Sequence, residues 1–290
     1  MNNRQRRILV TGDTGFVGAA LRQEFSRHSG VEVLGASRSN GFDLLRRGSL
    51  DAIGDVASVV HLAGFVGVPE SWQNPVEAYH SNFVTTLNVL EYVRKRSARM
   101  VLLSSYIYGP PKSLPVDEDH PPNPESPYAR SKRAAEVLAE SYAKDFAVPV
   151  TILRPFNLYG RGQRAGLIPQ LVSQARQHGA VNIQDRRPRR DYLNVSDLAA
   201  AIVKIVSGER KTSGCETFNL GTGVSHSVDE VINILSRLLK RAIDVTCADT
   251  QRPNEIPDCR ADTRRIQAAY AWSPAVTLEE GLRDLLLEKS

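Results

Sequence analysis

Short apolar runs alternate with longer stretches of mixed polarity along the first half of this chain. The runs are rich in Val, Ile and Leu, which is typical of strands buried on both faces. The stretches between them contain good helix formers. Strands and helices that alternate in this way predict an α/β fold with a doubly wound parallel sheet. The predicted strands are residues 7–11, 31–36, 57–64, 100–103 and 150–154, and the predicted helices are residues 19–25, 79–93 and one that follows Pro127.

The pattern changes after about residue 160, where helices and a strand no longer alternate regularly. The residues Val195, Ser196 and Asp197 are predicted to cap a helix. We therefore predict a first domain over residues 1–165, with 190–206 returning to it, and a smaller C-terminal α/β domain formed mainly by 166–290. The elements predicted in this half are helices 168–178, 198–206, 228–240 and 278–287 and a strand at 216–221.

Composition indicates the class of protein, its compartment and the kind of ligand to expect. Its 290 residues are 41% hydrophobic and 24% charged, as in ordinary soluble globular proteins. No apolar run approaches the roughly 18 residues of a membrane span, and the start lacks a signal-peptide core. The three cysteines are widely spaced without a metal-binding pattern, so we expect a reduced, cytoplasmic protein without a metal site. The net charge of +5 is scattered, which favours an anionic ligand over nucleic acid or a membrane.

A glycine-rich turn joins the first strand to the first helix. Gly12, Gly15 and Gly18 follow strand 7–11 with the spacing G-x-x-G-x-x-G, and Phe16 and Val17 lie among them. Glycines let the backbone approach a pyrophosphate, which the free N–H groups of the helix start then hold. The alternative is an ordinary glycine turn. The flanking strand and helix favour a dinucleotide-binding loop.

The end of the second strand bears on the kind of dinucleotide. An acid at this place holds a ribose 2′-hydroxyl, whereas an arginine accommodates a 2′-phosphate. This chain has Ser37 and Arg38 there and no acid, so we expect NADP(H) to be favoured over NAD(H). The alternative is a solvated arginine. Asp43, beside Leu44, is a candidate acceptor for an adenine amino group or simply a turn aspartate.

Candidate catalytic chemistry lies on the helix that follows Pro127. Tyr128 and Lys132 are four residues apart and therefore share one helix face. An ammonium about 6 Å away, at an effective dielectric constant of about 20, contributes roughly 3 kcal/mol, which predicts a phenol pKa about two units lower. Such a phenol serves as a general acid or base. The alternative is a surface lysine beside a half-buried tyrosine.

Other polar residues stand where parallel strands end, facing the ligand crevice of such sheets. Ser104, Ser105 and Tyr106 follow strand 100–103. His61, in strand 57–64, fits a core histidine better than a catalyst. The basic run from Arg186 to Arg190 is either a solvated face or a phosphate contact.

Taken together, these motifs resemble one known family over residues 8–287. The chain is similar to extended short-chain dehydrogenase/reductases of the nucleotide-sugar epimerase/dehydratase family. That resemblance implies a Rossmann-type NAD(P)-binding first domain, a nucleotide-sugar-binding second domain and a homodimer. The motifs that carry it, in order, are Gly12/Gly15/Gly18, Asn82, Ser104, Tyr128/Lys132, Phe156-Asn157 and Arg190-Asp191-Tyr192.

The resemblance also implies roles for individual residues. Tyr128 would exchange a proton with a sugar oxygen, Lys132 would hold the nicotinamide ribose, and Ser104 would hydrogen-bond the same sugar oxygen, with Ser105 the less favoured candidate. Further cofactor contacts are expected from Leu62, Ala63, Gly64, Asn82 and Pro155, and substrate contacts from Ser105, Tyr106, Asn157, Arg190, Arg252 and Glu255.

Departures from relatives within that family narrow the reaction. The 4,6-dehydratases have an acidic pair after the serine or threonine, where this chain has Ser105 and Tyr106. The 3,5-epimerase/reductases have a cysteine at the position of Tyr106. The segment 252–255 (Arg-Pro-Asn-Glu) resembles the Arg-Pro-x-Glu of GDP-mannose dehydratases and GDP-4-keto-6-deoxymannose reductases. The leading hypothesis is therefore an NADPH-dependent reductase of an NDP-4-keto-6-deoxy-sugar, with a GDP-linked substrate favoured.

Two alternatives stay open. One is a nucleotide-sugar 4-epimerase that retains NAD and uses the same residues twice. The other is a binding or sensor module without turnover. The presence of both Tyr128 and Lys132 disfavours the second.

Overall fold

The computed structural model describes residues 6–208, 214–250 and 255–288. The chain forms two compact units. Unit 1 comprises residues 1–109, 121–155 and 199–218, and unit 2 comprises residues 110–120, 156–198 and 219–290. The chain thus changes unit at residue 156, ahead of the predicted boundary at 165. Residues 110–120 belong to unit 2 because Val116 forms a parallel bridge with Ala261.

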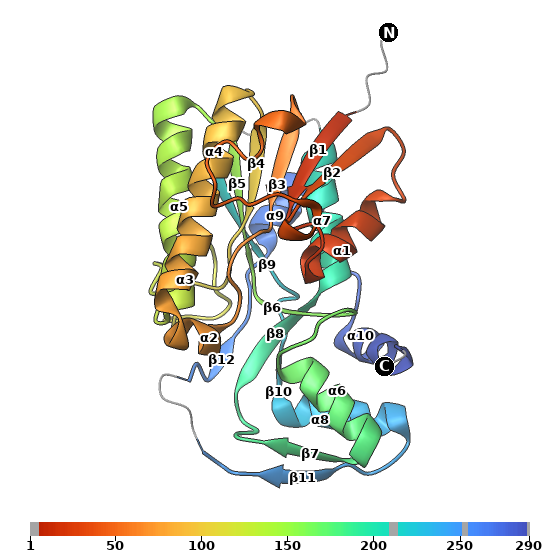
Figure 1. The fold of residues 1–290 in the computed structure, drawn as a ribbon. Helices are drawn as coiled ribbons and strands as arrows, with labels where there is room; N and C mark the ends of the chain where they lie inside the picture. Colours follow the sequence, from red (N-terminus) through yellow and green to blue (C-terminus); the bar gives the residue numbers. More distant parts are fainter. Residues whose placement is uncertain (1–5, 209–213, 251–254, 289–290) are drawn as a thin grey trace. The chain divides into compact units, whose positions relative to one another are not determined.

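Unit 1 is built on a six-stranded sheet, which confirms the predicted doubly wound α/β fold (Figure 1). The pairings among its first five strands are parallel. Thr11, the last residue of β1, lies beside Ala36 of β2 and His61 of β3, so three strands end at one edge. The strand order, with bounds, is β2 (Val31–Ala36), β1 (Arg6–Thr11), β3 (Ser58–His61), β4 (Arg99–Leu103), β5 (Val150–Pro155) and β9 (Cys215–Leu220).

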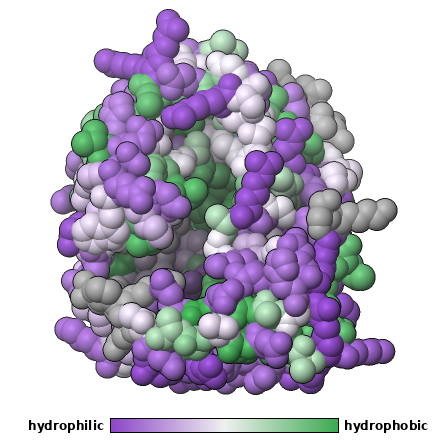
Figure 2. All heavy atoms as spheres, turned by 60° about the horizontal axis from the view of Figure 1, so that its bottom comes forward, coloured by the Kyte–Doolittle hydropathy of each residue, from purple (hydrophilic) through white to green (hydrophobic). Residues whose placement is uncertain are grey.

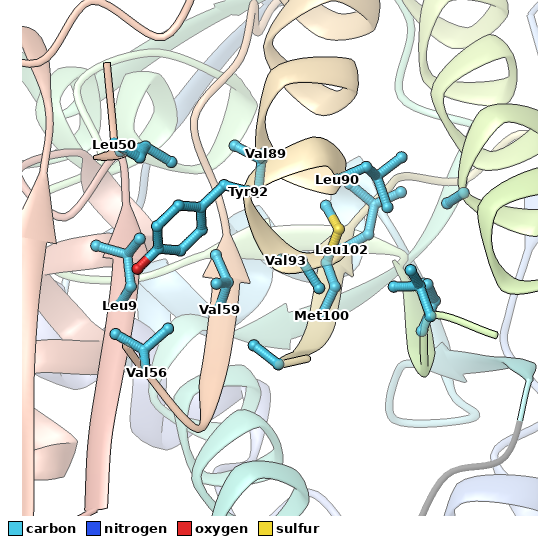
Figure 3. Packing of buried hydrophobic residues seen from close by; sticks show 14 of the residues in the cluster. Leu9, Leu50, Val56, Val59, Val89, Leu90, Tyr92, Val93, Met100 and Leu102 are labelled. Atoms are coloured by element: carbon cyan, nitrogen blue, oxygen red, sulfur yellow. The ribbon is translucent and has the colours of Figure 1, made fainter. Parts of the chain in front are cut away.

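Apolar packing fixes the helices on this sheet. Figure 3 shows Val89, Leu90 and Val93 of one helix packed over Leu9, Val59 and other buried strand residues. The chain reverses its order around β1 and β3, which is where ligands bind in open α/β sheets. The helices that accompany the sheet are α1 (Phe16–Phe25), α2 (Val68–Gln73), α3 (Pro75–Tyr79), α4 (Thr85–Lys95), α5 (Pro127–Phe146) and α7 (Val195–Ser207), and the short helices η1 (Arg38–Asn40) and η2 (Asp51–Ile53) lie between β2 and β3.

Unit 2 has its own core, in which α6 (Leu167–His178), α8 (Val228–Leu239) and α10 (Leu278–Leu287) pack together. The strand β8 (Arg189–Asn194) pairs with three others, and it therefore organises the segments that come from distant parts of the sequence. Its partners are β6 (Asn157–Tyr159), β10 (Ser225–Ser227) and β12 (Asp258–Cys259); the pair β7 (Ala180–Ile183) and β11 (Asp244–Cys247) and the helix α9 (Arg264–Tyr270) complete the unit.

Two predicted elements need correction. The helix expected over 79–93 is interrupted by a π-helical turn, η3 (His80–Val84), which carries Asn82. The helix α7 begins at Val195, so Asp197 lies inside it and does not cap it. Its carboxylate instead accepts hydrogen bonds from the backbone N–H groups of Ala275 and Val276 at 2.9 and 3.1 Å. The carboxylate of Asp197 therefore binds backbone groups that are distant in sequence, although its local sequence predicted a helix cap.

Hydrophilic residues cover most of the face drawn in Figure 2, with apolar residues in smaller groups. Among the helices of the described residues, none combines the length and the apolar character needed to span a lipid bilayer.

Candidate active site

The glycine loop lies against the loop that follows β3. Gly12 has a φ of +71°, and a Cβ there would lie 2.8 Å from the backbone nitrogen of Ala63. A side chain at this position would therefore push the two loops apart. α1 then begins at Phe16 behind Gly15, whose lack of a side chain leaves the helix start uncapped. The loop and the first N–H groups of α1, including those of Val17 and Gly18, thus fit a pyrophosphate.

The turn after β2 is fastened to the glycine loop. Ser37 and Asn40 form a reciprocal capping box around η1. The hydroxyl of Ser39 donates to Thr14 Oγ1 at 3.2 Å. Arg38 lies in this turn with its side chain 74% exposed and 3.9 Å from Glu77 Oε1. A weak, exposed ion pair of this kind leaves the guanidinium open to a phosphate.

Asp43 occupies a tight turn next along the chain. Its Oδ1 accepts a hydrogen bond from Leu45 N at 3.1 Å, which is the turn role that sequence left open. The side chain of Asn88 donates to the carbonyl of Leu44 at 2.8 Å and so ties this turn to α4. Asp43 remains a predicted adenine contact.

Helix α5 positions the tyrosine and lysine. Pro127 starts the helix, and the N-cap hydroxyl of Ser126 accepts from Ala129 N at 3.1 Å. Tyr128 therefore lies in the first turn, where it is half-buried. Lys132, one turn later, is only 7% exposed, and its Nζ donates to the carbonyl of Leu103 at 2.9 Å. The ammonium is thus anchored at the end of β4, beside Ser104.

The electrostatics of the pair differ from the prediction. Burial raises the pKa of Tyr128, and a side-chain hydrogen bond with Ser105 opposes that rise. Burial also lowers the pKa of Lys132 to about 8, against a raising effect of Glu136. The expected lowering of the phenol pKa by Lys132 is therefore wrong for this structure, because desolvation dominates. Tyr128 keeps its proton at neutral pH.

A narrow pocket lies between β3, β4 and α5. Its lining includes His61, Ala63, Asn82, Ser104 and Lys132. Within the described residues, the buried hydroxyl of Ser104 has no hydrogen-bond partner. A buried hydroxyl without a partner is unfavourable, so Ser104 is available to an oxygen from outside the chain.

His61 is a core histidine. Its Nδ1 lies 2.7 Å from Thr11 Oγ1 and its Nε2 lies 3.2 Å from Thr86 Oγ1. Burial, followed by the charge of Lys132, lowers the pKa of His61 to about 3. The imidazole is therefore neutral and joins three elements of the sheet edge.

Asn82 acts as a link within the site. Its Nδ2 donates to Ser131 Oγ at 2.8 Å, and its Oδ1 accepts from Phe65 N at 2.9 Å. A Cβ at Gly64 would lie 3.7 Å from Lys132 Nζ and would collide with the Asn82 side chain. Asn82 therefore connects α5 to the loop after β3 (Leu62, Ala63 and Gly64), and its direct contact with a cofactor stays a prediction.

The predicted substrate residues divide between the two units. Ser105 and Tyr106 lie in unit 1, where the Tyr106 hydroxyl donates to the carbonyl of Gly109 at 2.6 Å. In unit 2, Arg190 pairs with Glu255 and donates to the carbonyl of Ile256 at 2.6 Å.

The remaining substrate residues are Asn157 and Arg252. Asn157, in β6, lies 3.9 Å from Cys259 Sγ, and Arg252 falls outside the described residues. Pro155, a predicted cofactor contact, is the buried last residue of β5 in unit 1.

Carboxylates lie beside the basic run. Arg187, Arg189 and Arg190 form close ion pairs, whereas the exposed pair of Arg186 at 3.9 Å is as loose as that of Arg38. The pairs are Arg186–Asp229, Arg187–Asp185, Arg189–Glu230 and Arg190–Glu255.

Sequence reasoning missed a buried ion pair next to Lys132. Arg154, at the end of β5, donates to Glu136 at 2.9 and 2.7 Å and to the hydroxyl of Tyr108 at 2.9 Å. Glu136 is fully buried on α5, one turn beyond Lys132. Glu136 follows Lys132 by four residues, so the sequence could have indicated that the two side chains share one face of the helix.

Comparison with known proteins agrees with this geometry. A sequence model described as the NAD dependent epimerase/dehydratase family matches residues 8–221. The chain is 29% identical to GDP-6-deoxy-D-mannose reductase of Pseudomonas aeruginosa, over 97% of this chain and 96% of that protein. It is 28% identical to UDP-glucose 4-epimerase of Bacillus subtilis, over 96% and 95% of the two chains.

Solved structures are similar over the same length. RMD from Pseudomonas aeruginosa complexed with NADPH has a TM-score of 0.88 and 29% identity, covering 97% of each chain. UDP-glucuronic acid 4-epimerase from Bacillus cereus, in complex with UDP-glucuronic acid and NAD, has a TM-score of 0.88 and 26% identity, covering 97% of this chain and 98% of that one. The chain therefore belongs to the NAD-dependent epimerase/dehydratase family and is an NAD(P)-dependent enzyme of the extended short-chain dehydrogenase/reductase type, with sugar-nucleotide epimerases and reductases among its relatives.

Proposed function

We propose that this enzyme is an NADPH-dependent reductase of an NDP-4-keto-6-deoxy-sugar, with a GDP-linked substrate favoured. The observation that carries the proposal is the proton-transfer geometry: the buried Ser104 hydroxyl has no partner among the described residues, Lys132 lines the same pocket, and Tyr128 lies one turn before Lys132 on α5. Burial raises the pKa of Tyr128, which agrees with this role. A phenol that keeps its proton at neutral pH suits a proton donor, which reduction of a ketone requires. An epimerase must also run the same tyrosine as a base.

The residues around Tyr128 account for the remaining chemistry. A bound reduced nicotinamide supplies a hydride to C4 of the sugar. As the C4 carbonyl becomes an alkoxide, Tyr128 gives its proton to O4 and later regains one from solvent. The unpartnered hydroxyl of Ser104 can donate to the same oxygen as charge builds on it. Lys132, anchored on the carbonyl of Leu103, would hold the nicotinamide ribose.

Preference for NADPH is supported by the end of β2. Arg38 is exposed and only loosely paired with Glu77, and the hydroxyls of Ser37 and Ser39 lie in the same turn. A guanidinium beside hydroxyl groups suits a phosphate monoester. The similar structure of RMD was obtained with NADPH, which adds support.

A GDP-linked substrate is inferred from a relative and from the residues of unit 2. The relative from Pseudomonas aeruginosa acts on a GDP-linked deoxysugar by its name. Within unit 2, we assign Arg190 and Asn157 to substrate binding, together with Glu255 and with Arg252, which lies outside the described residues. The pairing of Arg190 with Glu255 would orient the guanidinium for a diphosphate.

A second candidate is a nucleotide-sugar 4-epimerase that keeps NAD bound. The observation that favours it is the similarity, at comparable identity, to UDP-glucose 4-epimerases and to epimerase structures that hold NAD.

One experiment separates the two functions. Purified enzyme is given GDP-4-keto-6-deoxymannose or its dTDP-linked counterpart, and NADPH absorbance is followed. The reductase should consume NADPH in step with the ketone. If neither ketone is reduced while a UDP- or GDP-hexose is interconverted without net cofactor use, the epimerase assignment replaces the reductase.

We also propose that the protein forms a homodimer through unit 1. Large apolar side chains are exposed on neighbouring helices, among them Trp72 at 59% on α2, Val76 at 80% on α3 and Val137 at 45% on α5. Both α2 and α3 contact α5, so these side chains belong to adjoining elements. Exposed apolar groups of this kind mark association surfaces, and a second copy is the occupant we propose.

A further inference from the structure

Asp13 is a buried carboxylate inside the glycine loop. Its side chain is 0% exposed, and Arg22 Nη1 of α1 donates to its Oδ2 at 2.8 Å. Asn40 Nδ2, from the turn after β2, donates to its Oδ1 at 3.4 Å. A carboxylate that loses water must be compensated by such partners. One side chain therefore joins the loop, the helix and the turn.

Two glycines make room for Asp13, one for its carboxylate and one for its backbone. A Cβ at Gly35, near the end of β2, would lie 2.5 Å from Asp13 Cγ. A Cβ at Gly18, in α1, would lie 2.6 Å from Asp13 Cα. Glycine inside a strand or helix is destabilising, and it marks sites where another group approaches closely. β2 and α1 thus both leave space for Asp13 at the positions of these glycines.

The turn that Asp13 holds is the one that carries Arg38. Asn40 also accepts from Ser37 N at 2.6 Å, which closes the turn on itself. Ser39 donates to Thr14, so the turn is fixed to the glycine loop at two points. Among the residues that the structure describes, Arg38 has only its exposed pair with Glu77 to orient it, so the backbone of the turn decides where its guanidinium lies.

We propose that Asp13 determines the cofactor preference of this site without contacting the cofactor. By holding Asn40 it keeps the turn in the position from which Arg38 and Ser39 bind a phosphate monoester on the cofactor ribose. Arg22 balances the charge of Asp13, so the carboxylate does not repel that phosphate. The role rests on the NADPH use proposed above.

A competing role for Asp13 is to bind the ribose hydroxyls itself, as the acid at the end of the second strand does in NAD-binding folds. The geometry opposes it. Both oxygens of Asp13 already accept hydrogen bonds, and its side chain is fully buried. The two roles predict opposite cofactor effects, which makes them separable.

The test compares NADPH and NADH affinities of Asp13→Ala, Asn40→Ala and the double variant by isothermal titration. Removing Asp13 leaves no buried charge, since Arg22 is 59% exposed, and Asn40 is itself exposed. Each single variant should bind NADPH about tenfold more weakly, with NADH affinity changed by less than about twofold. The NADPH affinity lost in the double variant should be smaller than the sum of the two single losses, because each single variant already removes the contact between Asp13 and Asn40. Arg27→Ala, which removes an exposed arginine paired with Glu24, is the control.

The outcomes separate this role from the proposed function. Equal weakening of both cofactors means that Asp13 only shapes the glycine loop, and a greater loss of NADH means that it binds the ribose; either overturns the proposal. Unchanged NADPH affinity in Asn40→Ala also overturns it. If the wild type binds NADH as tightly as NADPH, the proposed cofactor preference is refuted. If the wild type prefers NADPH and the variants keep that preference, only the role of Asp13 is refuted.

Discussion

Replacing Tyr128 with Phe tests the proton donor with little structural disturbance. The structure gives the phenol a side-chain hydrogen bond with Ser105. Both residues are half-buried, so Ser105 can turn to water when that partner is lost. The net contribution of such a bond is about 1 kcal/mol, which lowers the melting temperature of a protein of this size by about 2–4 °C. The fold and NADPH binding should therefore persist.

The loss of turnover should be much larger than the loss of stability. A positioned general acid contributes about 10² to 10⁴ in rate, equivalent to about 3–5 kcal/mol in the activation free energy. We expect kcat to fall by that factor while the dissociation constant of NADPH changes by less than about twofold. Ser104 and Lys132 are untouched, so a residual rate from hydride positioning should remain.

The assay is steady-state NADPH oxidation with the 4-keto-6-deoxy sugar nucleotide, alongside NADPH titration. Tyr142→Phe is the matched control, because it also removes a tyrosine hydroxyl from α5. That hydroxyl donates to Glu91 Oε1 at 2.9 Å. It should keep wild-type kcat. Near wild-type activity in Tyr128→Phe, or an equal loss in both variants, would refute the assignment of Tyr128 as the acid.

Four further predictions follow from the site. Arg38→Asp should weaken NADPH far more than NADH in titrations, and equal effects would remove Arg38 from phosphate binding. Because burial lowers the pKa of Lys132 to about 8, its charge is lost as pH rises, so the KM for NADPH should increase between about pH 7 and 9. Lys132→Met should abolish that dependence; a wild-type KM that stays flat would contradict the reasoning. With Ser105 and Tyr106 in place of an acidic pair, GDP-mannose and dTDP-glucose should show no loss of water by mass spectrometry. Val76→Asp should shift the mass from dimer to monomer in light scattering, and a monomeric wild type would refute the dimer.

Local sequence patterns were sufficient to predict the main strands of unit 1 and its glycine-rich loop. Apolar runs predicted the first five strands, and G-x-x-G-x-x-G between a strand and a helix predicted the loop at Gly12. The four-residue spacing predicted that Tyr128 and Lys132 share a helix, which α5 confirms. These features depend on neighbours within a few residues, so the sequence determines them by itself.

Only the tertiary structure decided the chemistry of those residues. Sequence spacing predicted a lower phenol pKa, but burial of Tyr128 raises it, and the depth of burial depends on packing from distant segments. The same holds for Asp197, whose backbone partners lie about 80 residues away along the chain, where no local capping rule applies.

Charge was likewise decided by the fold. The sequence run from Arg186 to Arg190 suggested a cationic surface, yet the fold brings Glu230 to Arg189 and Glu255 to Arg190. Asp13 lies in the glycine-rich turn of the sequence, and the absence of a Cβ at Gly35 lets its carboxylate be buried against β2. Sequence thus determined which groups are present and their local spacing. The packing of remote segments determined which groups are desolvated and which charges meet, because both depend on neighbours in space.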